Sequence, residues 1–289
     1  MKHIAYNAFL PLGTSLSLAQ LHALGNGIGR LMWAVLPSRR KETTACMRER
    51  LGLGEREARA LAKASFRHSA CSFLELFHAR HMDHRFLEER IEYENPDLFV
   101  RMGSTLRPVV GVTGHLGCWE LLGGVLKRFN TKTDCHVVAR LPKDKALADL
   151  LMHMRTQSKI RVLPHREAAT EAMGQLRRGG LCAFLVDHNC KSAEAQFLPF
   201  LGKTAAVNKG PAILALRAKA EVWPFFLIRL PQGRFRAVTL PCLDTATLVG
   251  SRAERIEQIC RFYTEAVEKM VRRYPEQWFW MHRRWKTQP

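Results

Sequence analysis

Short apolar runs alternate with amphipathic stretches along most of this chain, and that alternation is what most constrains its fold. Runs typical of buried strands lie at 108–113, 135–139, 160–163, 181–186 and 222–230. Stretches with helical periodicity separate them, at 117–129, 143–158, 167–178 and 209–219. Strands alternating with helices of about ten to fifteen residues predict an α/β fold. We expect a central, mostly parallel sheet flanked by helices.

Two further elements complete this core. The turn Pro231-Gln-Gly233 separates the strand at 222–230 from a second run at 235–240, which predicts a hairpin. Residues 252–274 have the periodicity of a long amphipathic helix.

The N-terminal part of the chain has a different pattern. Residues 39–104 are predicted to be helical, and between Glu55 and Met82 the apolar positions recur every three or four residues. No Pro/Ser/Gly-rich linker, repeat or low-complexity tract interrupts the chain. We therefore expect a helical N-terminal region over 1–104, which is a candidate for membrane association, and an α/β core over 105–289, packed together as one domain.

An apolar stripe near the N-terminus allows two interpretations. Leucine, isoleucine, methionine and valine recur at helical spacing, at positions 18, 21, 24, 28, 31, 32 and 35, before Pro37 and the cations Arg39-Arg40-Lys41. Polar residues interrupt the preceding segment too often for a spanning helix, which needs about 20 predominantly apolar residues. An apolar face beside cations suits shallow insertion at an anionic membrane. Packing of the stripe on the protein's own core is the other interpretation.

The chain carries a formal net charge of +19, which favours anionic partners. A membrane surface, an acidic protein and a nucleic acid all fit this charge, as does a basic surface without a specific partner. No cationic run is long enough for a nucleic-acid-binding tail, and no zinc-finger, RNP or KH pattern is present. We expect no nucleic-acid partner.

The eight cysteines are scattered and form no CxxC pair. In a chain of this length they indicate reduced thiols in a cytosolic environment, and neither a disulfide framework nor a metal site.

The segment Gly111-Val-Thr-Gly-His-Leu-Gly-Cys-Trp-Glu120 carries the clearest chemical signal. His115 is a natural general base, because the pKa of histidine lies near neutrality. A nearby carboxylate, Glu120, can hold the imidazole in one tautomer. Five residues of helix turn by about 500°, so the two side chains meet only if His115 lies in a loop before the helix. Gly114 and Gly117 permit such a turn. By itself the HxxxxE spacing also occurs by chance.

A second polar residue follows a strand in the same way. Asp187 comes directly after the run at 181–186, and His115 comes just after the run at 108–113. Sites in open α/β sheets gather beyond the carboxyl ends of the strands. We therefore expect these two residues to converge on one cleft.

Four blocks, in order, resemble one enzyme family. Gly114-His-Leu-Gly-Cys-Trp-Glu120 is similar to the G-H-x-G-N-W-E motif of the lipid A late acyltransferases, within the wider HxxxxD/E acyltransferases. The segment from Leu185-Val-Asp187 to Pro199-Phe-Leu-Gly202 resembles a second family block, and 210–224 resembles a third. Pro275-Glu-Gln-Trp-Phe-Trp-Met-His-Arg-Arg-Trp285 is close to the family's C-terminal P-E-Q-W-x-W-x-H-R-R-W. Together the blocks cover most of 107–286.

The resemblance implies an acyltransferase at the cytoplasmic face of a bacterial inner membrane, attached peripherally or as a monotopic protein. It would move a fatty acyl chain from a thioester of acyl carrier protein or coenzyme A to a hydroxyl of a lipid A precursor or related glycolipid, in lipopolysaccharide biosynthesis. No metal and no further cofactor is implied. Acyl carrier protein, an anionic glycolipid or phospholipid, and the membrane surface would be its partners.

The resemblance also implies roles for individual residues. His115 matches the family's base and Glu120 its partner, while Arg140 and Asp187 fall in blocks associated with the substrate cleft. Arg155 aligns loosely with another family arginine. Cys118 stands where the family usually has Asn, and His188 where Gln is frequent. Cys118 resembles a nucleophile, but direct transfer makes it a packing residue of the motif.

In the expected mechanism Glu120 binds one imidazole nitrogen of His115, and the other nitrogen takes the proton of the acceptor hydroxyl. Backbone N–H groups near Gly114–Gly117, or a cation such as Arg140, would stabilise the oxyanion. Two alternatives stay open: a lysophospholipid, aminolipid or other glycolipid as acceptor, and a non-catalytic basic protein that binds membranes or nucleic acid. The tryptophans and arginines of the last block fit either the membrane interface or the core.

Overall fold

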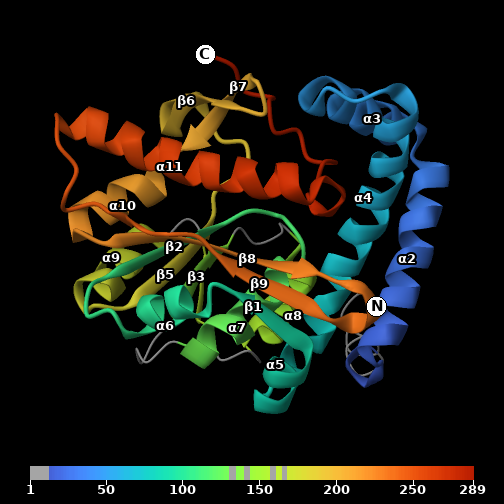
Figure 1. Ribbon diagram of the computed structural model, residues 1–289, viewed down its shortest axis with the longest axis horizontal. Helices are drawn as coiled ribbons and strands as arrows, with labels where there is room; N and C mark the ends of the chain where they lie inside the picture. Colours follow the sequence, from blue (N-terminus) through green and yellow to red (C-terminus); the bar gives the residue numbers. More distant parts are fainter. Residues whose placement is uncertain (1–12, 130–134, 140–143, 157–160, 165–167) are drawn as a thin grey trace.

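A twisted sheet forms the centre of the molecule, with helices on both faces (Figure 1). The computed structural model describes residues 13–129, 135–139, 144–156, 161–164 and 168–289. Within these residues the sheet has eight strands, in the order β1-β9-β8-β2-β5-β3-β4, with β10 paired to β8. The strands are β1 (Ile91–Glu94), β2 (Val109–Thr113), β3 (Cys135–Ala139), β4 (Arg161–Pro164), β5 (Leu181–Leu185), β8 (Glu221–Arg229), β9 (Phe235–Thr239) and β10 (Leu243–Asp244).

Neighbouring strands run parallel except where β8 meets β9 and β10. The prediction of a mostly parallel α/β sheet with a helical N-terminal region is confirmed. The hairpin predicted around Pro231–Gly233 is the β8–β9 pair. β8 is buried along its whole length, as expected for a central strand covered on both faces.

The two faces of the sheet are covered by different helices. One is covered by α9 (Ala168–Arg177), α10 (Gly210–Ala218) and α11 (Arg252–Arg273), which pack on Val110, Val112 and their neighbours. The other is covered by α6 (Pro96–Ser104), α7 (Leu122–Phe129) and α8 (Lys145–Thr156), which share a core with Val109 and Leu181. Alternate residues of β2 thus enter opposite cores, as the strand period of two requires.

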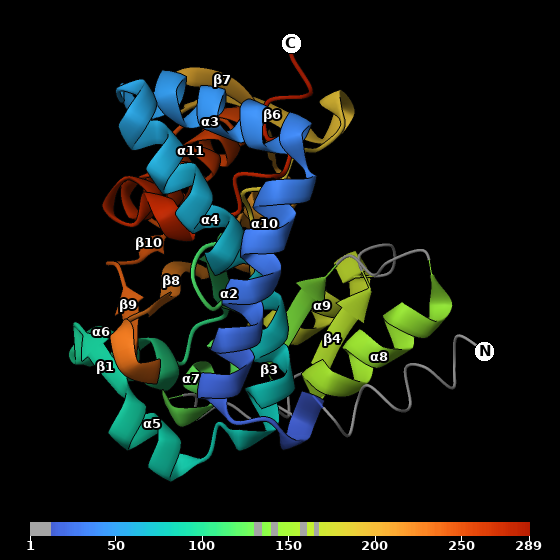
Figure 2. The ribbon, with the colours of Figure 1, turned by 90° about the vertical axis from the view of Figure 1, so that its right-hand side faces the viewer.

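Helices of the N-terminal region lie along one end of this sheet (Figures 1 and 2). They are α2 (Leu18–Val35), α3 (Pro37–Leu51), α4 (Glu55–Glu75), the 3₁₀ turn η1 (Leu76–His81) and α5 (His84–Arg90). Ser17 and Gln20 form a capping box at the start of α2, and Pro37 begins α3. Among the described residues no helix is long and apolar enough to cross a membrane.

Two elements differ from the sequence-based prediction. β1 lies inside the region predicted to be wholly helical and pairs with β9. A separate hairpin pairs β6 (Ala195–Phe200) with β7 (Lys203–Asn208). It lies between the predicted strand at 181–186 and the predicted helix at 209–219, where no helix or strand was expected. Both strands of this hairpin contain polar residues and are only partly buried, so neither has a strong apolar run.

The packing interpretation of the N-terminal apolar stripe is confirmed for one side of α2, and insertion at a membrane stays a prediction. Leu21, Gly25, Gly29 and Trp33 are buried on the side that faces α4. A Cβ on Gly29 would lie 2.8 Å from the carbonyl oxygen of Phe66, so the two helices approach closely.

We predict that Gly29→Ala destabilises the protein by about 1–3 kcal/mol, because the added methyl group overpacks the contact with α4. Gly27→Ala is the matched control: a Cβ on Gly27 has no neighbour within 4 Å. It should be neutral or stabilise by up to about 1 kcal/mol, through helix propensity alone. Urea unfolding midpoints measure both effects, and equal midpoints for the two variants would contradict close α2–α4 packing.

Candidate active site

His115 and Asp187 meet at the carboxyl ends of two adjacent parallel strands. Thr113 of β2 is paired with Leu185 of β5, and each functional residue lies two positions further along. The Nδ1 atom of His115 is 2.8 Å from Oδ1 of Asp187. The prediction that the two residues converge is confirmed.

Asp187 is a buried carboxylate with several hydrogen-bond donors. Its Oδ2 atom accepts hydrogen bonds from the backbone N–H of His115 at 2.7 Å and from Nε1–H of Trp278 at 2.8 Å. Burial raises the pKa of this carboxyl, but the interactions with His115 and the Trp278 donor outweigh it and hold the pKa well below its usual range. Asp187 is therefore ionised at neutral pH.

The pKa of His115 is shifted the opposite way. Burial lowers it, but the charge of Asp187 and the hydrogen bond to it have the larger combined effect and raise the pKa above its ordinary value. Because an ionised carboxylate only accepts, Nδ1 carries the proton in the neutral ring. Nε2 then has a free lone pair, which is the arrangement a general base requires.

Aromatic side chains surround the imidazole. The ring of Trp119 lies edge-on to His115 at 5.4 Å, and Phe279 lies 6.4 Å away. Phe73, which is 51% exposed, contacts both Trp119 and Phe279. The base therefore has an apolar wall on one side.

The predicted hydrogen bond between Glu120 and His115 is wrong. Glu120 instead holds Arg155 through two hydrogen bonds, of 2.6 and 2.9 Å. The 3₁₀ turn η2 (Trp119–Leu121) directs this carboxylate toward α8, while Asp187 already occupies Nδ1 of the imidazole. The HxxxxE spacing predicted Glu120 as the partner of His115. The register of β2 and β5 instead places the carboxylate of Asp187 against the imidazole.

Most backbone N–H groups of the expected oxyanion hole already have acceptors inside the protein. Each N–H group from His115 to Cys118 donates a hydrogen bond within the protein, in turn to Asp187 Oδ2, Gly114 O, Gln277 O and Leu227 O. Arg155 offers a different donor. Its Nη1 atom is buried and has no hydrogen-bond partner among the described residues.

Glycines 114 and 117 let other segments approach this loop. A Cβ on Gly114 would be 3.0 Å from Oδ2 of Asp187. Gly117 has φ of +64°, and a Cβ there would overlap the carbonyl oxygen of Leu227. Both glycines thus serve the packing of the loop, and their predicted role in binding substrate stays a prediction.

The C-terminal motif lies against the same loop. Leu116 forms a β-bridge with Trp278, and the backbone N–H of Phe279 donates to the carbonyl oxygen of His115 at 2.9 Å. Trp278 and Trp280 are buried, as is Arg284, which donates to the carbonyl oxygen of Ala206. For these three residues the core interpretation is confirmed.

A second buried charge cluster supports the loop from behind. Arg229, at the end of β8, binds both carboxylate oxygens of Glu75 at 2.7 Å and donates to Ser72 at 3.0 Å. Ser72 donates to the carbonyl oxygen of Gly117 at 2.6 Å. Burial raises the pKa of Glu75, but Arg229 and the hydrogen bond to His22 bring it to about 2. The cluster therefore joins α2, α4 and β8 to the loop that carries His115 and Gly117.

Cys118 is completely buried beside this cluster. Burial raises the pKa of its thiol well above the ordinary value. A thiol that stays protonated is a poor nucleophile, so the structure favours the packing role.

Sequence reasoning missed three parts of the site. Glu75 and Arg229 each stand in an apolar run, and a charge in such a run is a usable signal of a buried pair. Trp278 belongs to the C-terminal motif, but nothing in the sequence connects its indole to Asp187. The predicted site residue Arg140 lies outside the described residues.

A buried carboxylate that orients a histidine at the carboxyl edge of a parallel sheet is an arrangement suited to general base catalysis on a hydroxyl group. Comparison with known proteins identifies the family. Residues 3–287 match the bacterial lipid A biosynthesis acyltransferases, and the chain belongs to this family. Membership of a family of acyltransferases disfavours the non-catalytic alternative.

A curated relative agrees with the family assignment. The lipid A biosynthesis lauroyltransferase of Escherichia coli (strain K12) is 27% identical over 150 residues. The matched region covers 51% of this chain and spans about half (47%) of the relative's length.

We predict that the imidazole of His115 titrates above the ordinary histidine pKa of about 6.5. In Asp187→Asn the stabilising charge is lost, so burial dominates and the pKa should fall below that value. Glu120→Gln should cause a smaller shift, because the Glu120 charge is shared with Arg155. NMR titration of the histidine rings measures the pKa of His115 in the wild type and in both variants. A large shift in Glu120→Gln with none in Asp187→Asn would assign the partner role to Glu120.

Proposed function

We propose that this protein transfers a fatty acyl chain from a thioester of acyl carrier protein or coenzyme A to a hydroxyl of a lipid A precursor or a related glycolipid. The observation that carries the proposal is the His115–Asp187 pair, with Nε2 of the imidazole left as the base. The family assignment supports a lipid A-type acceptor, and the name of the lauroyltransferase relative supports a fatty acyl donor.

The reaction begins with proton transfer from the acceptor hydroxyl to Nε2 of His115. The hydroxyl oxygen attacks the thioester carbonyl, and a tetrahedral oxyanion forms. When the C–S bond breaks, the thiolate leaves and takes the proton from the imidazolium. Asp187 stays ionised throughout and stabilises the imidazolium through Nδ1–H.

Arg155 is the proposed oxyanion donor, in place of the backbone of the loop. Its guanidinium is held by Glu120 through two charge-assisted hydrogen bonds. That anchoring leaves Nη1 for the oxyanion, in a site that excludes most water. The acidic residue of the HxxxxE motif thus orients an arginine, and Asp187 orients the histidine.

The acyl chain is proposed to lie along the aromatic wall of His115. Trp119, Phe279 and the half-exposed Phe73 present continuous apolar surface next to the base. Such surface suits the first methylene groups of a fatty acyl thioester.

The outer face of α2 is proposed to rest on the membrane that supplies the acceptor. Leu24, Ile28, Leu31 and Val35 recur at helical spacing and are 36–61% exposed. In Figure 2 α2 lies in front of α4, at the surface. Exposed cations flank the stripe, including Arg30 and Lys41. An apolar face edged by cations suits shallow, peripheral insertion into an anionic bilayer, here the cytoplasmic face of the inner membrane.

The net charge of +19 also fits the donor. An acidic carrier protein would be steered to a basic surface, with an association rate that falls as salt rises.

His115→Ala is predicted to lower kcat for acyl transfer by about 10²–10⁴-fold, because the base is lost. Arg155→Gln should lower kcat by about 10²–10³-fold, because a hydrogen-bond donor to the oxyanion is lost. The assay is mass spectrometry of the acylated lipid formed from acyl carrier protein thioester and a lipid A precursor.

His84→Ala is the matched control for His115→Ala, because His84 is exposed and its only described ion pair is with Glu88. It should retain full activity. Near-native turnover by His115→Ala would rule out the proposed mechanism.

Replacing Leu24, Ile28, Leu31 and Val35 together by serine is predicted to weaken binding to phosphatidylglycerol vesicles by at least about tenfold, through lost apolar burial. High salt should weaken binding of the wild type by screening the flanking cations. Vesicle flotation measures both. Leu106→Ser/Val249→Ser is the control, because these residues are exposed but lie away from α2. Equal vesicle binding by the two variants would overturn the assignment of α2 as the membrane-binding helix.

A further inference from the structure

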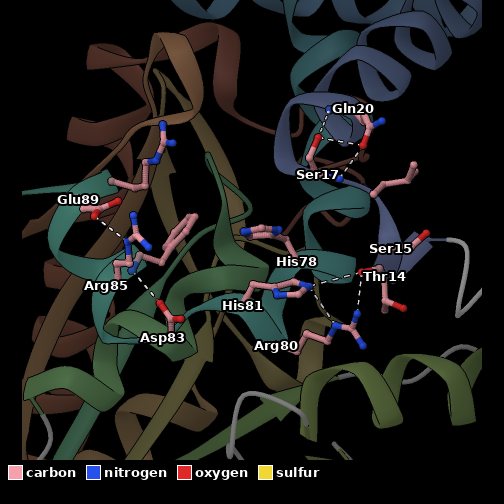
Figure 3. A pocket seen from close by; sticks show the side chains of 13 residues that line it. Thr14, Ser15, Ser17, Gln20, His78, Arg80, His81, Asp83, Arg85 and Glu89 are labelled. Atoms are coloured by element: carbon pink, nitrogen blue, oxygen red, sulfur yellow. Dashed lines mark hydrogen bonds and ion pairs between the residues drawn. The ribbon is translucent and has the colours of Figure 1, made fainter.

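A cavity of about 640 Å³ lies between the start of α2, η1 and α5 (Figure 3). The mechanism above does not use it. Figure 3 shows the rings of His78 and His81 in its middle, with Arg85 and Glu89 on one side and Thr14 and Ser17 on the other. Its volume is in the range of small-molecule sites.

Cationic side chains dominate the lining, with Arg80, Arg85 and Arg90 against Asp83 and Glu89. Both carboxylates are already engaged. Asp83 caps the N-terminus of α5, and Glu89 accepts a hydrogen bond from Arg85.

Two of the arginines keep an unneutralised charge. Arg80 donates to His81 and to the carbonyl oxygen of Thr14, and Arg90 donates to the carbonyl oxygen of Gln232. No ion pair joins either guanidinium to a carboxylate among the described residues. The cavity therefore favours an anion and disfavours a cation.

His78 supplies an independent observation. Both of its ring nitrogens are buried and have no hydrogen-bond partner among the described residues. Its ring lies 5.0 Å from that of His81 and 5.1 Å from that of Phe86. Burial and the neighbouring His81 lower the pKa of His78 to about 4, so the ring is neutral and offers one donor and one acceptor. Buried polar atoms left without partners point to a missing ligand.

Phosphate matches these groups better than other anions. Its oxygens accept from planar guanidinium groups in pairs, and a monoester OH can donate to a neutral imidazole. The cavity is larger than a phosphate group alone, and Thr14, Ser17 and Gln20 add hydroxyl and amide groups to its wall. A sugar that carries a phosphate fits both the size and the chemistry.

The cavity lies a short distance along the chain from the reacting centre. Phe73 belongs to the aromatic wall of His115, and His78 follows five residues later, a rise of about 9 Å along α4 and η1. η1 also packs on η2 and α8, the elements that carry Glu120 and Arg155. The headgroup of a glycolipid can span such a distance.

We propose that this cavity binds the phosphate-bearing headgroup of the glycolipid acceptor, with Arg80 and Arg90 as the anion-binding residues and His78 as a hydrogen-bonding partner. This assignment rests on the proposed acyl transfer to a glycolipid and adds to it the site that recognises the acceptor. The phosphate determines which acceptor is held, while His115 carries out the chemistry.

The test compares the phosphorylated acceptor with the same lipid after phosphatase treatment, in neutral detergent without phospholipid. Arg80→Gln/Arg90→Gln should lower kcat/KM for the phosphorylated acceptor by roughly tenfold or more, mainly through KM. Activity on the dephosphorylated acceptor and KM for the donor thioester should stay unchanged. Arg56→Gln/Arg177→Gln removes the same charge from exposed positions outside the cavity, and it should leave all values as in the wild type.

A second measurement does not depend on turnover. Inorganic phosphate, added to the wild-type protein, should shift the NMR signals of the His78 ring saturably, and the double variant should lose this response. Absence of the response in the wild type overturns the site. If the wild type acylates neither acceptor while the response persists, the proposed function fails and the anion site stands.

Two further outcomes overturn the assignment to the acceptor. An equal loss on both acceptors shows general disruption of the enzyme. Unchanged acceptor preference with weaker binding to phosphatidylglycerol vesicles shows that the cavity holds a phospholipid headgroup instead.

Discussion

The carboxylate of Asp187 is the interaction on which the active site depends. It is a buried charge, and a buried charge is tolerated only when donors surround it. Those donors are the imidazole and backbone of His115 and the indole of Trp278, so one carboxylate joins the loops after β2 and β5 to the C-terminal motif. The geometry of the base and the position of the motif are therefore set by the same group.

A second buried charge, Arg229, gives the loop its other support. Its pairing with Glu75 fixes Ser72, which binds the carbonyl oxygen of Gly117. Gln277 holds the backbone of Arg229 from the other side through two hydrogen bonds. The loop thus lies between two networks whose members come from α4, β5, β8 and the C-terminal motif. These networks account for the use of the N–H groups from His115 to Cys118 inside the protein.

Much of the fold was predictable, because the central strands are apolar on both faces. β3 has the predicted bounds, and the other central strands lie within about one residue of theirs. β1 and the β6–β7 hairpin were missed because they are only partly buried and mix polar with apolar residues, so neighbouring structure decides their conformation more than their own sequence does.

The site was predictable where it follows from topology. His115 and Asp187 end adjacent strands, so a parallel register brings them together. The Glu120–Arg155 pair depends on the angle at which η2 leaves the loop, and the contact of Trp278 with Asp187 joins residues far apart in sequence. Neither follows from periodicity or spacing, and the HxxxxE spacing suggested Glu120 where Asp187 is the hydrogen-bond partner of His115.

The hydrogen bonds of Gln277, Trp278 and Phe279 to the His115 loop have a consequence for biosynthesis. During translation the sheet strands and Asp187 are made long before these residues, so a nascent chain lacks the groups that fix the loop. The contacts that fix the His115–Asp187 pair are therefore completed only after the C-terminal motif has left the ribosome. A truncated chain that lacks this motif carries both residues of the pair without the groups that hold them in place.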